Sequence, residues 1–457
     1  MTRARGRVLV LAYHYPPVGG AGVQRTTAFC RFLPEHGYEP VVVTGRGAAG
    51  RWTPEDRSLA AGLDHRIHRV AEPEPNGPAG RLARLGLVRG RFAGWWAAGA
   101  LAAGREALRE GPIAAVLTSM SPYESAPVAA QLASEAGVPW IADLRDPWAL
   151  DEMVVYPSAL HRRRAMARMG RELSSADAVV MNTAGAAAAA TAAFPQLRRV
   201  TAIPNGYDPD DFSGPAPPPR GDGVLRIVHT GYLHTALGLQ HRARRVSWRG
   251  GEREPVDILP RSHVYLLEAI AGLAAAERDS VELHLAGSLS RADEDAIRRS
   301  PAADRVRTHG YLGHAASVEL VRGADLLFCP MHDLPQGGSA LIVPGKTYEY
   351  IAAGRPILAA LPAGDARELV RASGSGRVCD PKDVAAMRTI IGDELEAQRD
   401  GRGPSPVDQE ILQRYARPQL ADILARLLDE VATASRPLGR ITPRAELPTA
   451  GAGGRSA

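Results

Sequence analysis

Lysine is almost missing from this chain of 457 residues. Lys and Arg together number 55, yet only Lys346 and Lys382 are lysines. Arginine does not replace the compact ammonium group of lysine where a point charge must meet phosphate oxygens. A lysine kept against so strong a bias therefore indicates a specialised site.

The sequence around Lys346 indicates what such a site would hold. Lys346 follows Gly345 and precedes Glu349 by three residues, so on a helix the two charged side chains share one face. They would lie at the N-terminal end, where free backbone N–H groups and the helix dipole attract phosphate. This arrangement predicts a site for an anionic, hydroxyl-bearing ligand. The alternative is a surface lysine in an i,i+3 pair of little consequence.

Cysteine, aromatic residues and long apolar runs are also scarce. The three cysteines, Cys30, Cys329 and Cys379, are far apart, so neither a disulfide framework nor a zinc site is expected. Such a pattern favours a reducing, cytoplasmic environment. Aromatic residues make up 5% of the chain, which predicts a core of Ala, Val and Leu. No uncharged stretch is long enough to span a bilayer, and the apolar run Val8–Ala12 is too short for a signal peptide.

The net charge excludes few kinds of binding partner, but it does not favour nucleic acid. The net charge is +5, which is modest for this length. It permits an acidic ligand or an anionic surface, and it does not indicate a nucleic-acid partner. A hydrophobic content of 45% and a charged content of 23% are typical of a globular protein, and the length predicts two or three domains.

Short apolar runs alternate with helix-like stretches in both halves of the chain. In the first half the predicted strands are Val8–Ala12, Pro40–Thr44, Ala114–Thr118, Trp140–Asp143, Ala178–Asn182 and Val200–Pro204. In the second half they are Leu225–Thr230, Val281–Ala286, Val306–Thr308, Asp325–Cys329, Pro356–Leu361 and Gly376–Cys379. This alternation predicts two α/β domains with parallel sheets, which form a cleft between them.

Changes in composition set the predicted domain boundaries. The linker, residues 207–223, is rich in Pro, Gly and Asp. The insertion, residues 235–260, is Arg-rich without a sustained hydrophobic period and is expected to be mobile. The tail, residues 436–457, has the composition of a disordered segment. The helix near the end is expected to pack back on the first domain. In chain order, the predicted units are an N-terminal domain (1–206), a linker (207–223), a C-terminal domain (224–404) with an insertion (235–260), a helix (405–435) and a tail (436–457).

Two glycines, Gly19 and Gly20, follow the first predicted strand and Pro16-Pro17. Glycine lets the backbone approach a ligand closely, and the helix that follows offers free N–H groups. The spacing differs from the Gly-x-Gly-x-x-Gly fingerprint of dinucleotide-binding proteins, so a nicotinamide cofactor is not expected. The alternative is an ordinary tight turn between a strand and a helix.

Charged residues also gather where the strand Trp140–Asp143 ends. Asp143, Arg145 and Asp146 lie at the edge of a parallel sheet where ligands bind. One carboxylate is expected to contact an incoming hydroxyl, while Arg145 orients or neutralises the other. The alternative is a structural Asp–Arg pair with a helix cap.

Other basic residues are candidates for contacts with ligand or membrane. Arg261 opens a predicted helix and is expected to face the same edge of the cleft as Lys346. The basic stretch Arg81–Arg105 includes Trp95 and Trp96, a combination that favours a membrane-surface face. For His161–Arg164, a solvated helix face is the preferred interpretation.

Several short motifs occur in a fixed order along the chain. They are Tyr15–Gly20, Asp143–Trp148, Pro204–Asp208, His229–Gly231, Leu285–Gly287, His309–Leu312, Ala324–Asp325, Lys346–Pro356 and Ser373–Gly376. Each is weak alone, but together they resemble the retaining glycosyltransferases of the GT-B fold, glycosyltransferase family 4. The resemblance extends from Arg7 to about Leu428, and it implies two Rossmann-like domains facing across a cleft.

The resemblance implies a nucleotide-sugar donor, of the UDP or GDP type, held mainly by the C-terminal domain. It implies no metal and no other cofactor, since protein cations and backbone dipoles would stabilise the leaving diphosphate. That diphosphate would help to deprotonate the acceptor. The implied contacts are Glu349 to the ribose, Lys346, Arg261, Gly19 and Gly20 to the diphosphate, and Gly310, Tyr311 and Leu312 to the base.

The chain departs from the family pattern at two places. The family often has a Glu eight residues before the ribose-binding one, where this chain has Leu341, and His332 and Asp333 are candidates to compensate. Many members also carry a His near the sugar at the end of the fifth strand. Here that strand ends in Ala142-Asp143, and we expect Asp143 or Asp146 to face the reacting centre.

The expected function is therefore retaining transfer of a sugar to a hydroxyl of an envelope glycan, a glycolipid or a secondary metabolite. The alternatives are a nucleotide-sugar epimerase or hydrolase on the same fold, or a non-catalytic nucleotide-sugar-binding protein. The acceptor is expected to dock on the N-terminal domain, whose loops vary most in such families. A lipid-linked acceptor would use the Trp95-Trp96 region, with the protein peripheral at the inner face of the membrane.

Overall fold

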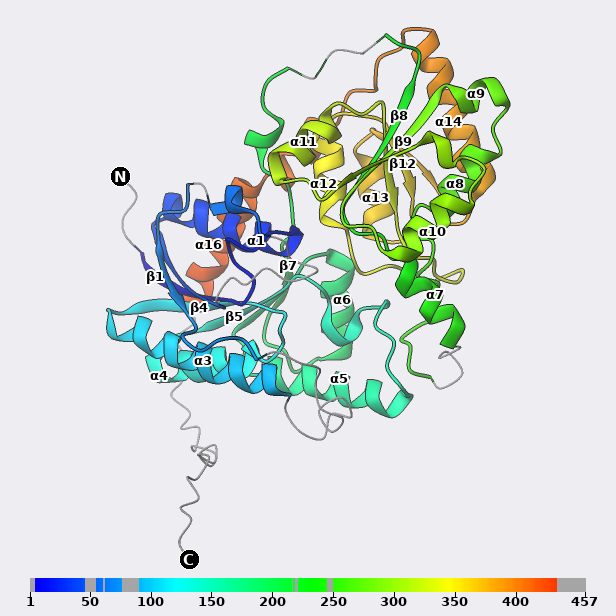
Figure 1. The fold of residues 1–457 in the computed structure, drawn as a ribbon. Helices are drawn as coiled ribbons and strands as arrows, with labels where there is room; N and C mark the ends of the chain where they lie inside the picture. Colours follow the sequence, from blue (N-terminus) through cyan, green and yellow to red (C-terminus); the bar gives the residue numbers. More distant parts are fainter. Residues whose placement is uncertain are drawn as a thin grey trace, which may run out of the picture.

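Two parallel sheets, each covered by helices on both faces, build the protein (Figure 1). The computed structural model describes residues 5–45, 55–60, 62–75, 90–215, 217, 221–244 and 250–433. The first sheet has the strand order β3-β2-β1-β4-β5-β6-β7, and the second has the order β10-β9-β8-β11-β12-β13. The predicted fold class, two Rossmann-like domains facing each other, is confirmed.

The first sheet contains every strand that the sequence predicts in this half, and one more. Its strands are β1 (Gly6–Ala12), β2 (Tyr38–Thr44), β3 (Arg66–Arg69), β4 (Ile113–Ser119), β5 (Trp140–Leu144), β6 (Ala178–Met181) and β7 (Val200–Ala202). The central strands are buried on both faces, so they form continuous apolar runs. The edge strand β3 is mostly exposed and charged, so hydrophobic periodicity did not reveal it.

The second sheet matches the six predicted strands to within two residues at each end. They are β8 (Leu225–Thr230), β9 (Val281–Ala286), β10 (Val306–Gly310), β11 (Leu326–Pro330), β12 (Ile357–Ala360) and β13 (Gly376–Cys379). All of their pairings are parallel. In a parallel sheet the carboxyl ends of the strands share one edge, and ligands bind in the crevice outside that edge.

Helices cover both faces of each sheet. On the first sheet, α3, α4, α5 and α6 pack on one face, and α1 with α16 on the other. On the second, α8 and α14 cover one face, and α12 with α13 the other. The helices are α1 (Ala21–Phe32), α3 (Arg91–Arg109), α4 (Ser125–Ala136), α5 (Ala159–Leu173), α6 (Ala184–Ala193), α7 (Thr235–Arg244), α8 (Val264–Ala271), α9 (Ala275–Asp279), α10 (Arg291–Arg299), α11 (His314–Arg322), α12 (Gly345–Ala352), α13 (Asp365–Ala372), α14 (Val384–Arg399), α15 (Gln409–Tyr415) and α16 (Arg417–Thr433).

The chain crosses between the domains twice, and the two crossings touch. After β7 it passes through Tyr207, whose N–H donates to the Tyr415 carbonyl, while the Arg417 N–H donates to the Tyr207 carbonyl. Helix α16 then packs on α1 and adds Leu420 and Leu424 to the core of the first domain. The single helix expected over 405–435 is thus two helices, broken at Ala416, because the chain pairs with the first crossing there.

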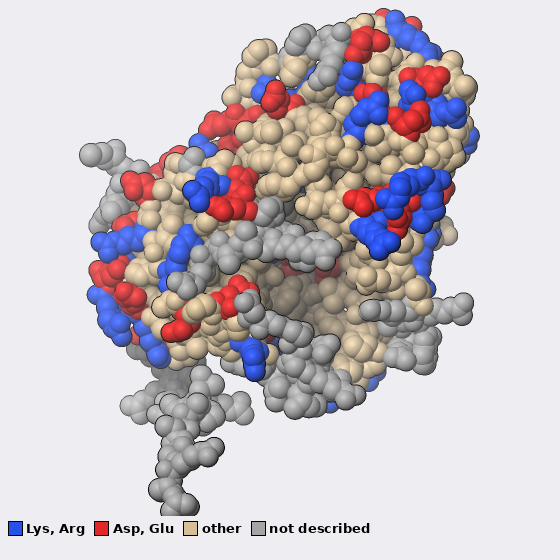
Figure 2. Space-filling view, in the orientation of Figure 1, with Lys and Arg blue, Asp and Glu red and all other residues tan. Residues whose placement is uncertain are grey.

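The segment 235–260 is more ordered than its composition suggests. Residues Thr235–Arg244 form α7, and Val256, Ile258 and Leu259 are buried. Parts of the predicted insertion thus form a helix or pack into the protein core. Its centre, residues 245–249, and the predicted disordered tail, 436–457, lie outside the described residues. In the space-filling view the surface is hollowed between the two domains (Figure 2).

Candidate active site

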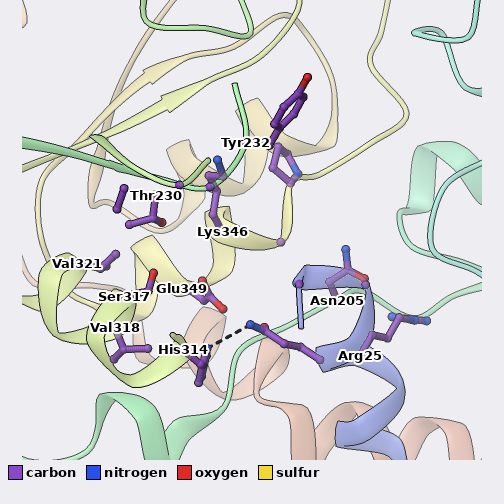
Figure 3. Close-up of a pocket in the computed structure, with 18 of the residues that line it drawn as sticks. Arg25, Asn205, Thr230, Tyr232, His314, Ser317, Val318, Val321, Lys346 and Glu349 are labelled. Atoms are coloured by element: carbon purple, nitrogen blue, oxygen red, sulfur yellow. Dashed lines mark hydrogen bonds between the residues drawn. The ribbon is translucent and has the colours of Figure 1, made fainter. Parts of the chain in front are cut away.

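A cavity of about 750 Å³ lies between the domains, at the carboxyl edges of both sheets. The C-terminal domain contributes the start of α12, the ends of β8 and β9, and one face of α11. The N-terminal domain contributes the start of α1 and the ends of β5 and β6. Lys346 and Glu349 lie on the α12 side, and Arg25 and Asn205 on the α1 side (Figure 3).

Lys346 is anchored by a neutral partner. Its Nζ lies 3.1 Å from Nε2 of His229, and Nδ1 of His229 lies 3.0 Å from the Phe328 carbonyl oxygen. A carbonyl only accepts, so Nδ1 carries the proton and Nε2 accepts from the ammonium. Burial, followed by the charge of Lys346, holds the pKa of His229 well below its usual value. The neutral His229 therefore does not neutralise the positive charge of Lys346.

The space around Lys346 fits an ammonium group closely. A Cβ on Gly231 would lie 3.1 Å from Nζ, and the φ of Gly231 is +103°, which side chains rarely adopt. Burial, with a further contribution from Arg261, lowers the pKa of Lys346 to about 8. The sequence showed His229-Thr230-Gly231 as a motif, but only the fold brings it against α12.

Glu349 lies one turn further along α12 and also lines the cavity. Burial raises its pKa, and the charges of Arg417 and His314 act against this. Arg417 donates to Oε1 of Gln24 at 2.6 Å, and Nε2 of Gln24 lies 3.2 Å from Nδ1 of His314. Residues from α1, α11 and α16 thus surround this carboxylate and link the two domains at its side.

Arg261 lines the same cavity, although it does not open a helix as predicted. Helix α8 begins at Val264, and Arg261 sits in the turn before it. Its Nη1 contacts Sδ of Met153, a residue of the N-terminal domain, at 2.9 Å. Burial lowers the pKa of Arg261, and Asp151 and Asp146 oppose the shift. Two cations, Lys346 and Arg261, therefore share this side of the cavity.

The wall beyond Glu349 combines an exposed aromatic ring with apolar side chains. Tyr311 and Leu312 line the cavity, whereas Gly310 is not among the lining residues, and its carbonyl accepts from the Gly287 N–H at 2.7 Å. Helix α11 adds Ser317, Val318 and Val321 to this wall. Sequence reasoning missed these three, because helical spacing alone does not show what an amphipathic helix faces.

The start of α1 forms the opposite wall. Gly20 has a φ of +109° and lines the cavity together with Gly22, while Gly19 is not among the lining residues. No side chain caps α1, and no acidic residue lies in its first turn. Within this uncapped first turn, the Val23 N–H donates to the Gly20 carbonyl.

Two family models match the chain in the order of its two domains. Residues 19–206 match the glycosyl transferase 4-like domain, and residues 259–396 match glycosyl transferases group 1. The chain belongs to the GT-B glycosyltransferases. It is an enzyme that takes its sugar from a nucleotide-sugar donor. No curated protein sequence matches it significantly.

Solved structures with this fold resemble the glycosyltransferase over nearly its whole length. Sucrose-phosphate synthase from Thermosynechococcus elongatus has a TM-score of 0.65 at 16% identity, covering 94% of this chain and 100% of that one. Anabaena HepE in complex with UDP and glucose has a TM-score of 0.57 at 16% identity, covering 93% and 100%. WaaG, a glycosyltransferase of lipopolysaccharide biosynthesis, has a TM-score of 0.53 at 17% identity, covering 94% and 100%.

Asp143 lies in a buried ion pair and does not line the cavity of this glycosyltransferase. Both oxygens of its carboxylate accept from Arg25, with the closest contact at 2.6 Å, and both side chains are 2% exposed. Arg25 also donates to the Pro204 carbonyl. Arg25 thus engages the Asp143 carboxylate away from the cavity, whereas the exposed Asp146 lines it.

Leu341, where the family often has Glu, serves the domain interface instead. Its side chain packs into the core of the N-terminal domain, its N–H donates to Glu152 and its carbonyl accepts from Thr183. His332 is fully buried with Nε2 3.1 Å from Glu152, and Asp333 pairs with Lys382 at 2.6 Å. Neither lines the cavity, so the suggestion that they compensate for Leu341 is wrong.

The paired indoles expected at a membrane surface do not form an exposed patch. Trp96 is fully buried in the first core, and its Nε1 donates to Ser125. Trp95 is partly buried and packs against Tyr13. Trp96 is therefore a core residue. None of the described helices has the length and apolar character needed to cross a membrane.

The described residues contain no group of three or more His, Cys, Asp or Glu side chains that could hold a metal ion. Lys346, Arg261, Arg145 and Arg417 bring positive charge to the cavity, as do the starts of α12 and α1, whereas Arg25 is paired with Asp143.

Proposed function

We propose that this glycosyltransferase transfers a sugar with retention from a UDP- or GDP-type donor to an acceptor hydroxyl, without a metal ion. The observation that carries the proposal is the pairing, on one helix, of an uncompensated ammonium and an open carboxylate. Lys346 takes the donor diphosphate at the start of α12, with Arg261 beside it. Glu349, one turn later, accepts hydrogen bonds from the ribose.

The remaining walls suit the other parts of such a donor. Tyr311 and Leu312 contact the base, and α11 closes the apolar side of that subsite. The N–H groups near Gly20 approach the diphosphate from the N-terminal domain. Lys346, Arg261 and the start of α12 stabilise the charge that develops as the diphosphate leaves, which is the task a metal performs in other transferases.

Retention follows from a reaction on one face of the sugar. The leaving diphosphate helps to deprotonate an acceptor that approaches from the N-terminal side of the cavity. Asp146, exposed just after β5, is one of the carboxylates on that side. The acceptor hydroxyl belongs to an envelope glycan, a glycolipid or a small metabolite, and an acceptor linked to lipid would bring the protein to a membrane surface.

A thermal-shift screen across nucleoside diphosphates tests the donor site. UDP or GDP is expected to raise the unfolding temperature, because a ligand that binds only the folded state stabilises it. UDP is the first to try, since HepE binds UDP in its crystals. If no nucleoside diphosphate stabilises the protein, the donor assignment is wrong. Incubation of the matching nucleotide sugar without acceptor separates the alternatives, because an epimerase would release an epimer.

Replacing Glu349 with Gln is expected to remove recognition of the ribose. The wild type should bind UDP more tightly than 2′,3′-dideoxy-UDP by roughly 10- to 100-fold, the effect of hydrogen bonds to a charged group. In Glu349→Gln the two affinities should converge, as measured by calorimetry. The exposed Glu319 on α11 gives the control Glu319→Gln, which should keep the wild-type ratio. An unchanged ratio in Glu349→Gln would place the ribose elsewhere.

Donor affinity is expected to weaken as the pH rises above about 8, where Lys346 loses its proton in the free protein. The bound diphosphate favours the ammonium, so binding above this pKa requires proton uptake. The dissociation constant of UDP should rise by up to about tenfold per pH unit from 8 until the pKa of the complex is reached. Calorimetry between pH 7 and 9.5 measures this. A Lys346→Met variant should bind weakly with no such dependence.

A further inference from the structure

Arg145 has a charge that the protein itself does not neutralise. It follows β5 and lines the cavity on the side of the N-terminal domain. Sequence reasoning paired it with a neighbouring carboxylate, but Asp143 is engaged by Arg25. Within the described part of the chain, Arg145 forms no hydrogen bond or ion pair, and its Nε is buried without a partner. A guanidinium left in this state indicates a ligand.

The position of Arg145 is built into the first turn of α1. A Cβ on Gly22 would lie 1.2 Å from Nη1 of Arg145, so any other residue at position 22 would displace the guanidinium. The guanidinium therefore lies against the start of a helix of 12 residues that has no side-chain cap. Nearby His14 adds no positive charge, because burial and Arg145 lower its pKa to about 4.

A second polar group at this wall also lacks a partner. Asn182 follows β6, is 3% exposed and lines the cavity, and its Oδ1 forms no hydrogen bond. A buried amide oxygen without a donor is costly unless a ligand supplies one. A hydroxyl group is the simplest such donor. The ends of β5 and β6, which are neighbours in the sheet, thus present a cation and an acceptor side by side.

We propose that this wall is the acceptor subsite and that the acceptor carries an anionic group, such as a phosphate or a carboxylate. Arg145, held against the first turn of α1, binds the anion, and Asn182 accepts from a hydroxyl near it. This inference rests on the proposed function and deepens it, since it names the chemical class of the acceptor. Arg and helix starts are the groups that bind phosphate best, and Arg does so with two parallel bonds.

The donor has its own cations on the opposite wall. Lys346 and Arg261 belong to the C-terminal domain, whereas Arg145 belongs to the N-terminal domain and ends a different sheet. If Lys346 and Arg261 hold the donor diphosphate, Arg145 remains free to bind a second anion. The phosphate of a sugar phosphate and the phosphate next to a lipid would both bind a guanidinium in the same way. The structure therefore assigns an anionic group to the acceptor, and the experiment separates these two kinds of acceptor.

The test uses inorganic phosphate as the probe, titrated by calorimetry into the full-length protein saturated with UDP. The wild type should bind phosphate, and Arg145→Gln should weaken that binding at least roughly tenfold while changing UDP affinity by less than about twofold. Glycerol 3-phosphate should bind more tightly than phosphate, and Asn182→Ala should remove that gain. The matched control is Arg105→Gln, an exposed arginine of α3 paired with Glu135, which should behave as wild type.

Three results would overturn the inference. They are no phosphate binding to the wild type with UDP bound, equal binding to Arg145→Gln, and an equal loss of UDP affinity in Arg145→Gln, which would assign Arg145 to the donor. Arg145→Lys is the second variant if the first does not fold. If UDP itself fails to bind, the proposed function fails separately, and the phosphate titration of free wild type and variant still tests Arg145.

With the anion subsite established, the two sources are separated by competition. A sugar phosphate and vesicles that contain a phosphorylated lipid, each added to the UDP-bound protein, should displace glycerol 3-phosphate only if the protein accepts that form. Neutral glycerol and vesicles of uncharged lipid are the blanks. Displacement by neither form would overturn the assignment of this wall to an anionic acceptor.

Discussion

Replacing Lys346 with Ala is expected to lower kcat by a factor on the order of 10² to 10³, the effect of removing one preorganised charge that stabilises a developing anion. The leaving diphosphate would lose the ammonium that His229 holds at 3.1 Å without neutralising it. Donor affinity should fall as well, because Lys346 also contacts the ground state. Arginine should not restore activity, since the space bounded by Gly231 accommodates a compact ammonium.

The chain provides its own control for this experiment. Lys382, the other lysine, is 46% exposed and pairs with Asp333, away from the cavity. Lys382→Ala should retain the wild-type kcat and KM. Rates are measured as release of the nucleoside diphosphate from the nucleotide sugar that the thermal-shift screen identifies. Equal rates for Lys346→Ala and the wild type would show that the diphosphate does not bind at α12.

Breaking the buried ion pair of Arg25 and Asp143 is expected to cost about 3–5 kcal/mol of folding free energy. Both side chains are 2% exposed, so the group left behind would be a buried charge without a partner. Arg25 also ties α1 to the Pro204 carbonyl, next to the first crossing between the domains. Arg25→Met and Asp143→Leu should therefore destabilise the protein to a similar degree.

Chemical denaturation measures this loss, and the double variant identifies its cause. Arg25→Met with Asp143→Leu removes both charges, so it should recover a large part of the stability lost in either single variant. The control is Arg31→Met on the same helix, whose ion pair with Asp208 is partly exposed and should contribute about 1 kcal/mol or less. If Asp143→Asn kept full stability and lost turnover, Asp143 would be catalytic after all.

The regular elements were predictable because they depend on local patterns. Strands buried on both faces, such as Trp140–Leu144, form apolar runs that the sequence shows directly. The exposed edge strand Arg66–Arg69 has no such run, and only its pairing with β2 makes it a strand. Helix α7 lies in an Arg-rich stretch where composition masks the periodicity.

The residues of the candidate site likewise fall into those that the local sequence predicts and those that only distant contacts define. Lys346 and Glu349 are three residues apart on one helix, so their shared face followed from spacing alone. Arg25 and Asp143 are 118 residues apart, and nothing local indicates that they pair. The sequence equally suggested that Arg145 would serve a neighbouring carboxylate, and the fold gave that carboxylate to Arg25 instead.

By itself, the sequence determined the fold class, most strand positions and the Lys346–Glu349 face, because these depend on residues close together in the chain. The tertiary structure alone decided which charges are satisfied. It paired Asp143 with Arg25, joined Glu152 to the Leu341 N–H, buried Trp96 and left Arg145 and Asn182 open to the cavity. The physical reason is that a buried charge is stabilised or left uncompensated by atoms distant in sequence, which only the packing of the domains brings into contact.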